Sequence, residues 1–488
     1  MKVQLYSIFK NTMLPLDVSF IGETKYLSRP RELSRLALIR WPDGRPCHLA
    51  NHWLMKIATN TEARDTLRVY AANLTHLVRF CSQNKIEFHN FTDQNFSDFH
   101  AYLQKQKKSN SRVSEEFIGG NHIRAVQLRV LNFFVWINAN YPNLSSRKLI
   151  GSTSDCQIVI SYKTNPHNGQ QEIQHEYLES FKVPEDEKPV ITEAAIKRLR
   201  EAIFNAHDIQ NLKPRAKTKL TNDRELFLAR NNYIYHRRLF VIRMMRLTGL
   251  RPEELVDIDL TANLNVAKSK VLRLPTKKRE QPAPTRIFDI ELRSGLDFDR
   301  YVKCRNDFIV ILKSRGIIDT DPGSILVGVD GKELKKESMT TEFQRLVKAA
   351  DIGGMRCCLS MFRHRYITRE IHIHILMGFK KDPSLKISAT SGFIEDVCRT
   401  VQPKTGHKRY QSLLTYFHSE YKLLTSGAHR EEDMEIIDRL SANQDALYEV
   451  KFEARLQNNT EILAGVEQME ANTEKWLNEL LSPPKKDD

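Results

Sequence analysis

Five side chains spread over about 165 residues have the types needed for chemistry on a phosphate group. They are, in chain order, Arg251, Lys277, Arg363, His407 and Tyr416. The planar guanidinium of arginine can bind two oxygens of one phosphate and stays charged at any working pH. A tyrosine hydroxyl can become a covalent carrier, while lysine and histidine can supply or accept protons. Together, these residue types suit the displacement of one ester oxygen of a phosphodiester by another.

The surrounding sequence predicts the elements that position these residues. A helix over residues 235–248 ends at Gly249, a typical C-cap, and the next helix opens with Arg251 and Pro252. Arg251 therefore lies at a helix junction, where its side chain can face a cleft. Strand-like runs at 270–275 and 286–290 are joined by the lysine-rich turn TKKREQPAPT, and residues 360–366 (SMFRHRY) lead into a further helix.

This ordered set resembles the tyrosine recombinase (phage integrase) family. The family pattern has an arginine at a TGLR-x-x-E-like helix start, a lysine on a β-hairpin, a His-x-x-Arg box, a Gly-His pair, and a tyrosine nine residues after that histidine. In this chain the pattern falls on Arg251 with Glu254, Lys277, Ser360-x-x-Arg363, Gly406-His407 and Tyr416. The helical segment at 61–141 also resembles the family's core-binding domain, so the resemblance covers residues 60–425.

The resemblance implies a role for each of these side chains. Tyr416 attacks the scissile phosphate, which gives a 3′-phosphotyrosyl link and a free 5′-hydroxyl. Arg251 and Arg363 stabilise the extra negative charge of the transition state, with His407 as a further donor. Lys277 protonates the leaving 5′-oxygen. No metal and no other cofactor is expected, because the arginines do the charge work that magnesium does elsewhere.

A few positions leave alternatives open. Ser360 stands where the family has a histidine, and a serine cannot accept a proton near neutral pH as imidazole can, so the general base is open. His364, the residue after the box arginine, could compensate, or it could be structural, as a histidine at this position often is in the family. Lys278 and Lys270 are alternatives for the hairpin lysine. Glu254 is expected to be a structural partner of a local amide or arginine.

The charge of the chain points to a polyanionic partner. The 488 residues carry 75 Lys+Arg against 60 Asp+Glu, a net charge of +15. Residues 426–488 hold 7 Lys+Arg and 15 Asp+Glu, a net of −8, which leaves +23 on residues 1–425. A basic body of this kind favours nucleic acid, and no apolar run of about 18 residues predicts a membrane span. With the resemblance, duplex DNA becomes the expected partner, without a membrane.

Composition and periodicity divide the chain into five expected segments. These are an N-terminal preface (1–60), a helical core-binding (SAM-like) DNA-binding domain (61–150), a linker (151–188), the catalytic domain (189–425) and an acidic helical tail (426–488). Strands are expected at 36–41 and 156–162, and a basic loop at 213–219. The expected fold class is mainly α with a small antiparallel β-sheet (α+β). Contacts to DNA are expected from the basic side chains of Lys107, Lys108, Arg112, Arg124, Arg129 and Lys278.

The function implied by the resemblance is that of a site-specific DNA recombinase or integrase of a mobile genetic element, in the cytoplasm of a bacterium and associated with the nucleoid. The family acts as four protomers on two DNA sites and exchanges C-terminal segments between neighbours, with accessory DNA-bending proteins as further partners. The acidic tail could dock in trans or cover basic surface before DNA arrives. Two alternatives stay open: a type IB topoisomerase-like enzyme, and an inactive DNA-binding protein of the same fold, for which Ser360 is the hint.

Overall fold

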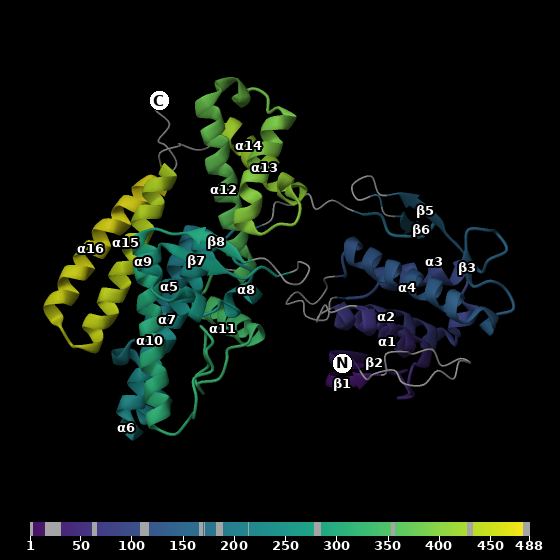
Figure 1. The fold of residues 1–488 in the computed structure, drawn as a ribbon, viewed down its shortest axis with the longest axis horizontal. Helices are drawn as coiled ribbons and strands as arrows, with labels where there is room; N and C mark the ends of the chain where they lie inside the picture. The colour runs from purple at the N-terminus through teal and green to yellow at the C-terminus, as the bar shows by residue number, and fades with distance from the viewer. Residues whose placement is uncertain are drawn as a thin grey trace. The chain divides into compact units, whose positions relative to one another are not determined.

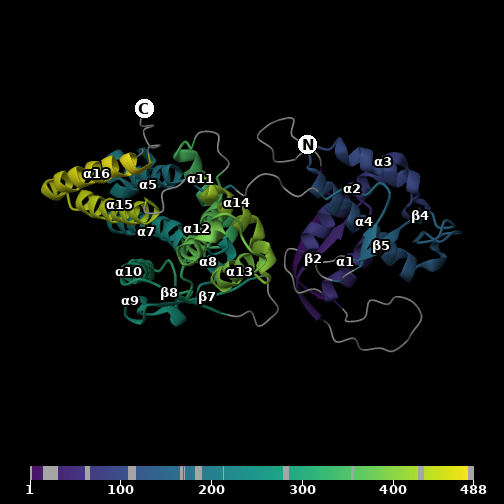
Figure 2. The same cartoon turned by 90° about the horizontal axis from the view of Figure 1, so that it is seen from above.

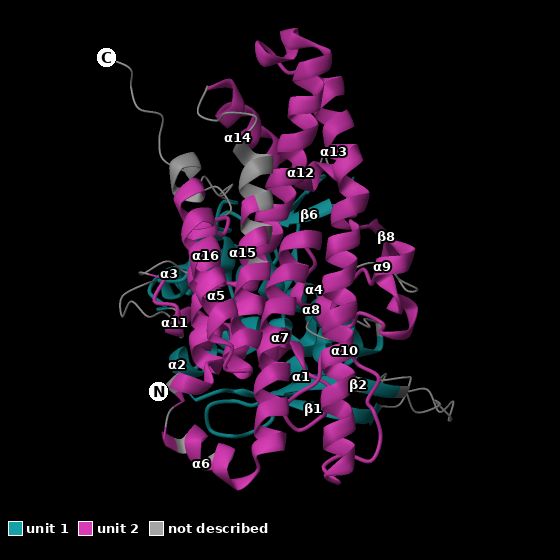
Figure 3. Cartoon of the chain, turned by 90° about the vertical axis from the view of Figure 1, so that its left-hand side faces the viewer, with its two compact units in different colours: residues 1–184 teal, residues 185–488 magenta. Residues whose placement is uncertain are grey.

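The protein is seen here as a computed structural model with two compact units. It describes residues 3–14, 31–60, 66–107, 117–164, 169, 171–181, 189–212, 214–277, 285–352, 357–426 and 433–481. The units are residues 1–184 and 185–488, coloured separately in Figure 3. Both are built mainly of helices, with strands confined to small two-stranded sheets, which confirms the predicted fold class. One described pair, β3 with β4, is parallel where only antiparallel pairing was expected.

The first unit combines an antiparallel hairpin, a helical bundle and short strands. Its elements are β1 (Tyr6–Leu14), β2 (Arg31–Ile39), α1 (His48–Asn60), α2 (Thr66–Asn84), α3 (Asp93–Gln104), α4 (Gly120–Asn140), β3 (Ile150–Gly151), β4 (Ile158–Val159), β5 (Ser161–Thr164) and β6 (Gln171–Gln174). The side chain of Thr92 accepts a hydrogen bond from the Asn95 amide in a capping box, which explains where α3 begins.

One aromatic-rich core ties the ends of this unit to its helices. Phe96 and Phe99 of α3 and Phe133 of α4 are fully buried in it. The same core also contains residues from both flanking segments, Leu36 of β2 and Ile158 of β4. The segments expected as a preface and a linker therefore contribute to the hydrophobic core of the bundle, because their few apolar residues are buried in it.

The second unit is larger and contains all of the candidate catalytic residues. Its elements are α5 (Glu193–His207), α6 (Pro214–Asn222), α7 (Arg224–Thr248), α8 (Pro252–Val256), α9 (Val266–Ser269), β7 (Val271–Leu274), β8 (Arg286–Asp289), α10 (Leu292–Ser314), α11 (Lys336–Ala349), α12 (Leu359–Lys381), α13 (Ser391–Thr405), α14 (Leu414–Thr425), α15 (Asp433–Leu456) and α16 (Thr460–Leu481). β7 and β8 pair antiparallel, as the two strand-like runs predict. The basic segment expected as a loop forms α6, since Pro214 suits a first helical turn and Arg, Ala and Lys favour helix.

Helix α12 joins two hydrophobic cores of this unit. Its first turns, with Met361 and Phe362, pack into the large core shared with α5, α7 and α10. Its later turns, with Ile367 and Ile371, pack with α13 and α14 into a smaller core, and Figure 1 shows these three helices gathered together. Residues between the two sets, from position 363 to 365, therefore lie where the two cores meet.

The acidic C-terminal segment forms a helical hairpin that docks on its own chain. α15 and α16 lie side by side next to α5, as Figure 2 shows from above. Tyr448 and Phe452 of α15 enter the large core, and the ring of Phe452 stacks on Tyr235 of α7 at 3.7 Å between centroids. Glu449 forms ion pairs with both Arg243 and Arg300. The described part of the tail thus pairs with basic side chains of its own chain.

We expect Glu449→Gln to destabilise the second unit by roughly 2–3 kcal/mol. The Glu449 side chain is 4% exposed and forms ion pairs with Arg243 on α7 and with Arg300 on α10. The neutral amide of glutamine would leave both arginines without their negatively charged partner. Chemical denaturation followed by circular dichroism measures the change. The control is Glu453→Gln, an exposed residue one turn further along α15, which should stay within about 0.5 kcal/mol of the native chain. Equal stabilities of the two variants would contradict a docking role for Glu449.

None of the helices in the described part of the chain combines the length and the apolar character needed to cross a membrane.

Candidate active site

The first candidate arginine lies at a tight junction between two helices. α7 ends at Gly249, whose φ of +58° is left-handed, and Arg251 is the N-cap residue of α8. A Cβ on Gly249 would lie 2.3 Å from Cδ1 of Tyr366 on α12, so only glycine fits this turn. The close approach of α7 to α12 at Gly249 therefore fixes the position of the junction from which the Arg251 side chain projects.

Glu254 is a buried carboxylate on which three parts of the unit converge. Its Oε1 accepts hydrogen bonds from Nη1 of Arg251 at 2.7 Å and from the Lys277 amide at 3.0 Å. Its Oε2 accepts from the Arg251 amide at 2.9 Å and from Nη2 of Arg286 at 3.0 Å. Burial disfavours the charged form, but Arg286, the two amides and the Arg251 charge outweigh it and hold the pKa of Glu254 below its ordinary value. The structural role expected for Glu254 is the one observed.

The second candidate arginine, Arg363, is buried where the two cores meet. Its guanidinium donates to the carbonyl oxygens of Gly249 and Thr405, each at 2.7 Å. Its Nη2 also lies 3.4 Å from Nε2 of His407. Burial lowers the pKa of Arg363 to about 10, and the nearby Arg251 charge acts in the same direction. Arg363 therefore keeps its positive charge at neutral pH, although its surroundings disfavour that charge.

His407 is held at the end of α13 by a second left-handed glycine. Gly406 caps the helix with a φ of +65°, and the Arg286 side chain would lie 3.3 Å from a Cβ at this position. Nδ1 of His407 lies 2.7 Å from Oγ1 of Thr405. Both ring nitrogens of His407 thus face fixed partners, one on the helix end and one on Arg363.

Tyr416 lies in the first turn of α14 and points at α12. Its hydroxyl oxygen is 2.6 Å from Nδ1 of His364, and the residue is 7% exposed. Burial raises the pKa of Tyr416 to about 12, against the opposing charge of Arg363. The phenol is therefore protonated at neutral pH and has an imidazole nitrogen at its oxygen.

The remaining catalytic candidates are Lys277, Ser360, Lys270 and Lys278, and the structure describes the first three of them. The Lys277 ammonium pairs with Asp257, while its amide reaches the Glu254 carboxylate as described above. Ser360 is exposed in the first turn of α12. Lys270 is exposed just before β7, with a left-handed φ of 52°. Lys278 lies outside the described residues.

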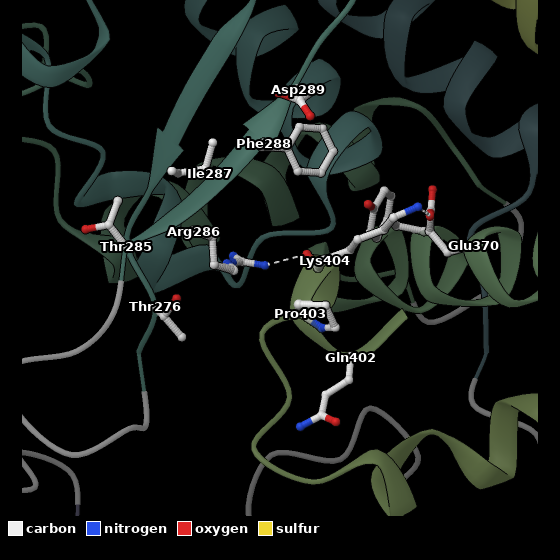
Figure 4. Close-up of a pocket in the computed structure, with 11 residues that line it drawn as sticks. Thr276, Thr285, Arg286, Ile287, Phe288, Asp289, Glu370, Gln402, Pro403 and Lys404 are labelled. Atoms are coloured by element: carbon white, nitrogen blue, oxygen red, sulfur yellow. Dashed lines mark hydrogen bonds and ion pairs between the residues drawn. The ribbon is translucent and has the colours of Figure 1, made fainter. Parts of the chain in front are cut away.

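Arg286 is a residue that sequence reasoning missed. Its Nη1 donates to the carbonyl oxygen of Lys404 at 2.9 Å, drawn as a dashed line in Figure 4, and its Nη2 reaches Glu254. It borders a cavity of about 1000 Å³ between β8, α12 and α13, together with Tyr366 and Glu370. The strand-like run at 286–290 is the only sequence signal here, and it does not single out one side chain.

The candidate DNA contacts of the first unit have varied surroundings. Lys107 is exposed at a bridge with Phe117. Nη1 of Arg124 donates to the Glu179 carbonyl oxygen at 2.8 Å. The Arg129 guanidinium lies 3.2 Å over the centre of the Tyr70 ring, and burial lowers its pKa. Arg124 and Arg129 thus have contacts within the chain itself, while Lys108 and Arg112 lie outside the described residues.

In the described ranges, no group of three or more His, Cys, Asp or Glu side chains could hold a metal ion. His372 and His374, two positions apart on α12, have separate partners. Nδ1 of His372 lies 2.7 Å from Oε1 of Glu420 on α14, and both residues are buried. Nε2 of His374 lies 3.4 Å from Nζ of Lys404. The two imidazoles therefore contact different groups.

Comparison with known families gives a match in the first unit. Residues 52–119 match the sequence model of the phage integrase SAM-like domain. This segment is thus similar to the phage integrase SAM-like domain. The match begins within α1, includes α2 and α3, and confirms the family resemblance predicted for the helical bundle. No curated protein sequence matches the chain.

Some solved structures are loosely similar to this chain. The post-cleavage complex of the XerH site-specific recombinase with palindromic difH is 11% identical, covers 78% of this chain and 84% of its own, and gives a TM-score of 0.44. A lambda integrase dimer bound to a COC′ core site is 10% identical, with 76% of each chain covered and a TM-score of 0.40. The XerA recombinase is 13% identical, with 79% of this chain and 99% of its own covered, at a TM-score of 0.29.

Proposed function

We propose that the chain is a site-specific DNA recombinase of the tyrosine type. In this proposal it cuts and rejoins duplex DNA through a 3′-phosphotyrosyl intermediate. The integrase SAM-like domain in the first unit would hold one face of the duplex, and the second unit would carry the chemistry. The net charge of +23 on residues 1–425 supplies affinity through phosphate contacts and counterion release.

One observation carries the proposal: the candidate residues converge from distant parts of the sequence. Arg363 lies 3.4 Å from His407, and its pKa is shifted by burial first and then by the charges of Arg251, Glu254, Arg286 and Tyr416. Arginines from three separate elements thus act on one another, and the charge of Arg363 also acts on the buried, protonated hydroxyl of Tyr416. Three arginine charges share the single buried carboxylate of Glu254, and the net positive charge that remains is what a dianionic phosphorane needs for stabilisation.

The proposed reaction balances without a metal. The hydroxyl oxygen of Tyr416 attacks phosphorus, the Oη–P bond forms and the P–O5′ bond breaks. The hydroxyl proton passes to a base, and a proton from Lys277 goes to the leaving 5′-oxygen. Arg251 and Arg363 bind the non-bridging oxygens, with His407 as a further donor. In the second half of the reaction, the 5′-hydroxyl of another strand attacks the phosphotyrosine, and these proton transfers reverse.

The partners in this proposal are duplex DNA and further copies of the chain. Four protomers on two DNA sites would complete an exchange, with DNA-bending proteins as accessory partners, in the cytoplasm of a bacterium and at its nucleoid. The α15–α16 hairpin docks in cis on α5, α7 and α10, so any exchanged segment would have to be a different one or would have to release these contacts.

Covalent trapping tests the proposal. The full chain is incubated with a pool of nicked duplexes of randomised sequence, in which cleavage near the nick releases a short strand and prevents religation. Protein–DNA adducts that survive detergent are captured, and the attached DNA and the modified peptide are sequenced. We expect an adduct at a restricted set of DNA sequences, linked through a 3′-phosphate to Tyr416, that forms equally in the presence of EDTA. Absence of any adduct would support an inactive DNA-binding protein.

A second assay separates the recombinase from a type IB topoisomerase. The selected sequence is placed in two copies on a supercoiled plasmid, and a plasmid without it serves as the control. A recombinase exchanges DNA between the two copies and leaves the control plasmid supercoiled. Relaxation of both plasmids without exchange would favour the topoisomerase.

A further inference from the structure

The catalytic set as proposed lacks an obvious acceptor for the tyrosine proton. Ser360, at the position where a histidine was expected, is exposed, and its hydroxyl is a poor proton acceptor near neutral pH. The two ring nitrogens of His407 face Arg363 and Thr405. Yet the phenol of Tyr416 has to lose its proton as it attacks, since burial raises its pKa to about 12.

A different imidazole is in contact with the reacting oxygen. Nδ1 of His364 lies 2.6 Å from the Tyr416 hydroxyl oxygen, within the range of a hydrogen bond from O–H to nitrogen. In the neutral tautomer with its hydrogen on Nε2, Nδ1 has the lone pair that accepts this bond. The two rings are 5.9 Å apart between centroids, so the contact comes from the polar edges of both side chains.

A second polar contact holds the two helices that carry this pair. His372 follows His364 by two turns on α12, and Glu420 follows Tyr416 by one turn on α14. Nδ1 of His372 lies 2.7 Å from Oε1 of Glu420, and the residues are 2% and 6% exposed. Together with the apolar core shared by α12, α13 and α14, this buried pair fixes α14 in the register that presents Tyr416 to His364.

We propose that His364 is the catalytic base that accepts the hydroxyl proton of Tyr416, in place of a histidine at Ser360. The inference rests on the proposed recombinase function and names the group that the proposal left open. As the Oη–P bond forms and P–O5′ breaks, the proton moves from Oη to Nδ1 of His364. The imidazolium returns this proton to Oη when a 5′-hydroxyl attacks the phosphotyrosine. The pair His372–Glu420 positions the tyrosine helix and touches no reacting atom.

Single-turnover cleavage of the trapped DNA sequence tests this role. His364→Ala removes the acceptor, while His364→Asn puts an amide oxygen near the place of Nδ1, which can accept the hydrogen bond but cannot take the proton. We expect both variants to cleave on the order of 100-fold to 10,000-fold more slowly than the native chain. The control is His418→Ala, an exposed histidine two residues after Tyr416, which should cleave within twofold of the native rate. A native rate in His364→Asn would show that only the hydrogen bond matters and would overturn the proposal.

A sulfur-substituted substrate separates loss of a base from loss of an acid. With sulfur in place of the bridging 5′-oxygen, the leaving thiolate departs without a proton. Lys277→Ala should regain most of its rate on this substrate, whereas the His364 variants should stay as slow as on ordinary DNA. Recovery of the His364 variants would assign them to the leaving-group side and overturn the proposal. If the native chain forms no adduct at Tyr416, the proposed function itself fails. If it does and the His364 variants match it, only this inference fails.

Discussion

Tyr416→Phe will form no covalent adduct with DNA, and its cleavage rate will fall by roughly a million-fold, below detection. The substitution removes one oxygen atom, which is the proposed nucleophile, and leaves the ring in its buried place in α14. The lost hydrogen bond to His364 should cost about 1 kcal/mol of stability, so the variant should fold and bind DNA as the native chain does. Detergent-resistant adducts on the nicked duplex measure the chemistry, and a gel-shift titration measures binding.

Tyr410→Phe is the matched control for this loss. Tyr410 lies in the short 3-10 turn Tyr410–Leu413, just before α14, with the Arg399 guanidinium 4.8 Å from its ring centre. Its ring packs and stacks in the same way with or without a hydroxyl, so the variant should form adducts at the native rate. An adduct that persists in Tyr416→Phe, or one that disappears in Tyr410→Phe, would show that the nine-residue spacing had selected the wrong tyrosine.

The sequence could nominate Arg251, Arg363, His407 and Tyr416 because each lies in a short pattern with a fixed spacing. Local chemistry also predicted elements around them. Gly249 ends α7, and α8 opens with Pro252 directly after Arg251. These signals depend on residues within one or two helical turns, so they can be read from a single chain.

Contacts between distant segments could not be predicted in this way. The link between His364 and Tyr416 joins residues 52 positions apart, and that between Arg363 and Gly249 spans 114 positions. Arg286 enters the site from a strand whose alternation says only which face is buried. The donors of Arg251, Lys277 and Arg286 meet at the Glu254 carboxylate because α8, β7 and β8 pack together. No spacing rule in the sequence encodes that packing.

The position of the acidic tail illustrates the same difference. Its charge and periodicity predicted helices, and left open whether these dock in trans or cover basic surface before DNA arrives. The structure buries Tyr448 and Phe452 in the core of the same chain and pairs Glu449 with two arginines there. The buried aromatic side chains add hydrophobic stabilisation to this docking, beyond what the two ion pairs of the buried Glu449 contribute.

Glu254→Ala will destabilise the second unit by roughly 3–5 kcal/mol and will remove cleavage activity with it. The fully buried carboxylate accepts four hydrogen bonds, two of them from the guanidinium groups of Arg251 and Arg286. Alanine would leave these two cations in a buried site without an anion, next to the Arg363 charge. Denaturation curves measure the stability, and adduct formation measures the activity. The control is Glu253→Gln, the half-buried neighbour that pairs with Lys336, which should lose no more than about 1 kcal/mol.

The unfolding free energy of Glu254→Gln, measured as a function of pH, separates the effect of the Glu254 charge from that of its shape. Glutamine keeps the volume and can still accept hydrogen bonds through one oxygen, so its cost reports chiefly the missing charge. Because the pKa of Glu254 in the folded chain lies below its ordinary value, its charge stabilises the fold above the unfolded pKa of about 4.3, and this contribution is lost as the pH falls through the folded pKa. The difference in unfolding free energy between the native chain and Glu254→Gln should therefore be largest near neutral pH and shrink below about pH 4.3. A difference that stays constant down to acid unfolding would mean that the carboxylate acts through packing, and that the arginines of the site are held in place by the backbone carbonyls of Gly249, Thr405 and Lys404 instead.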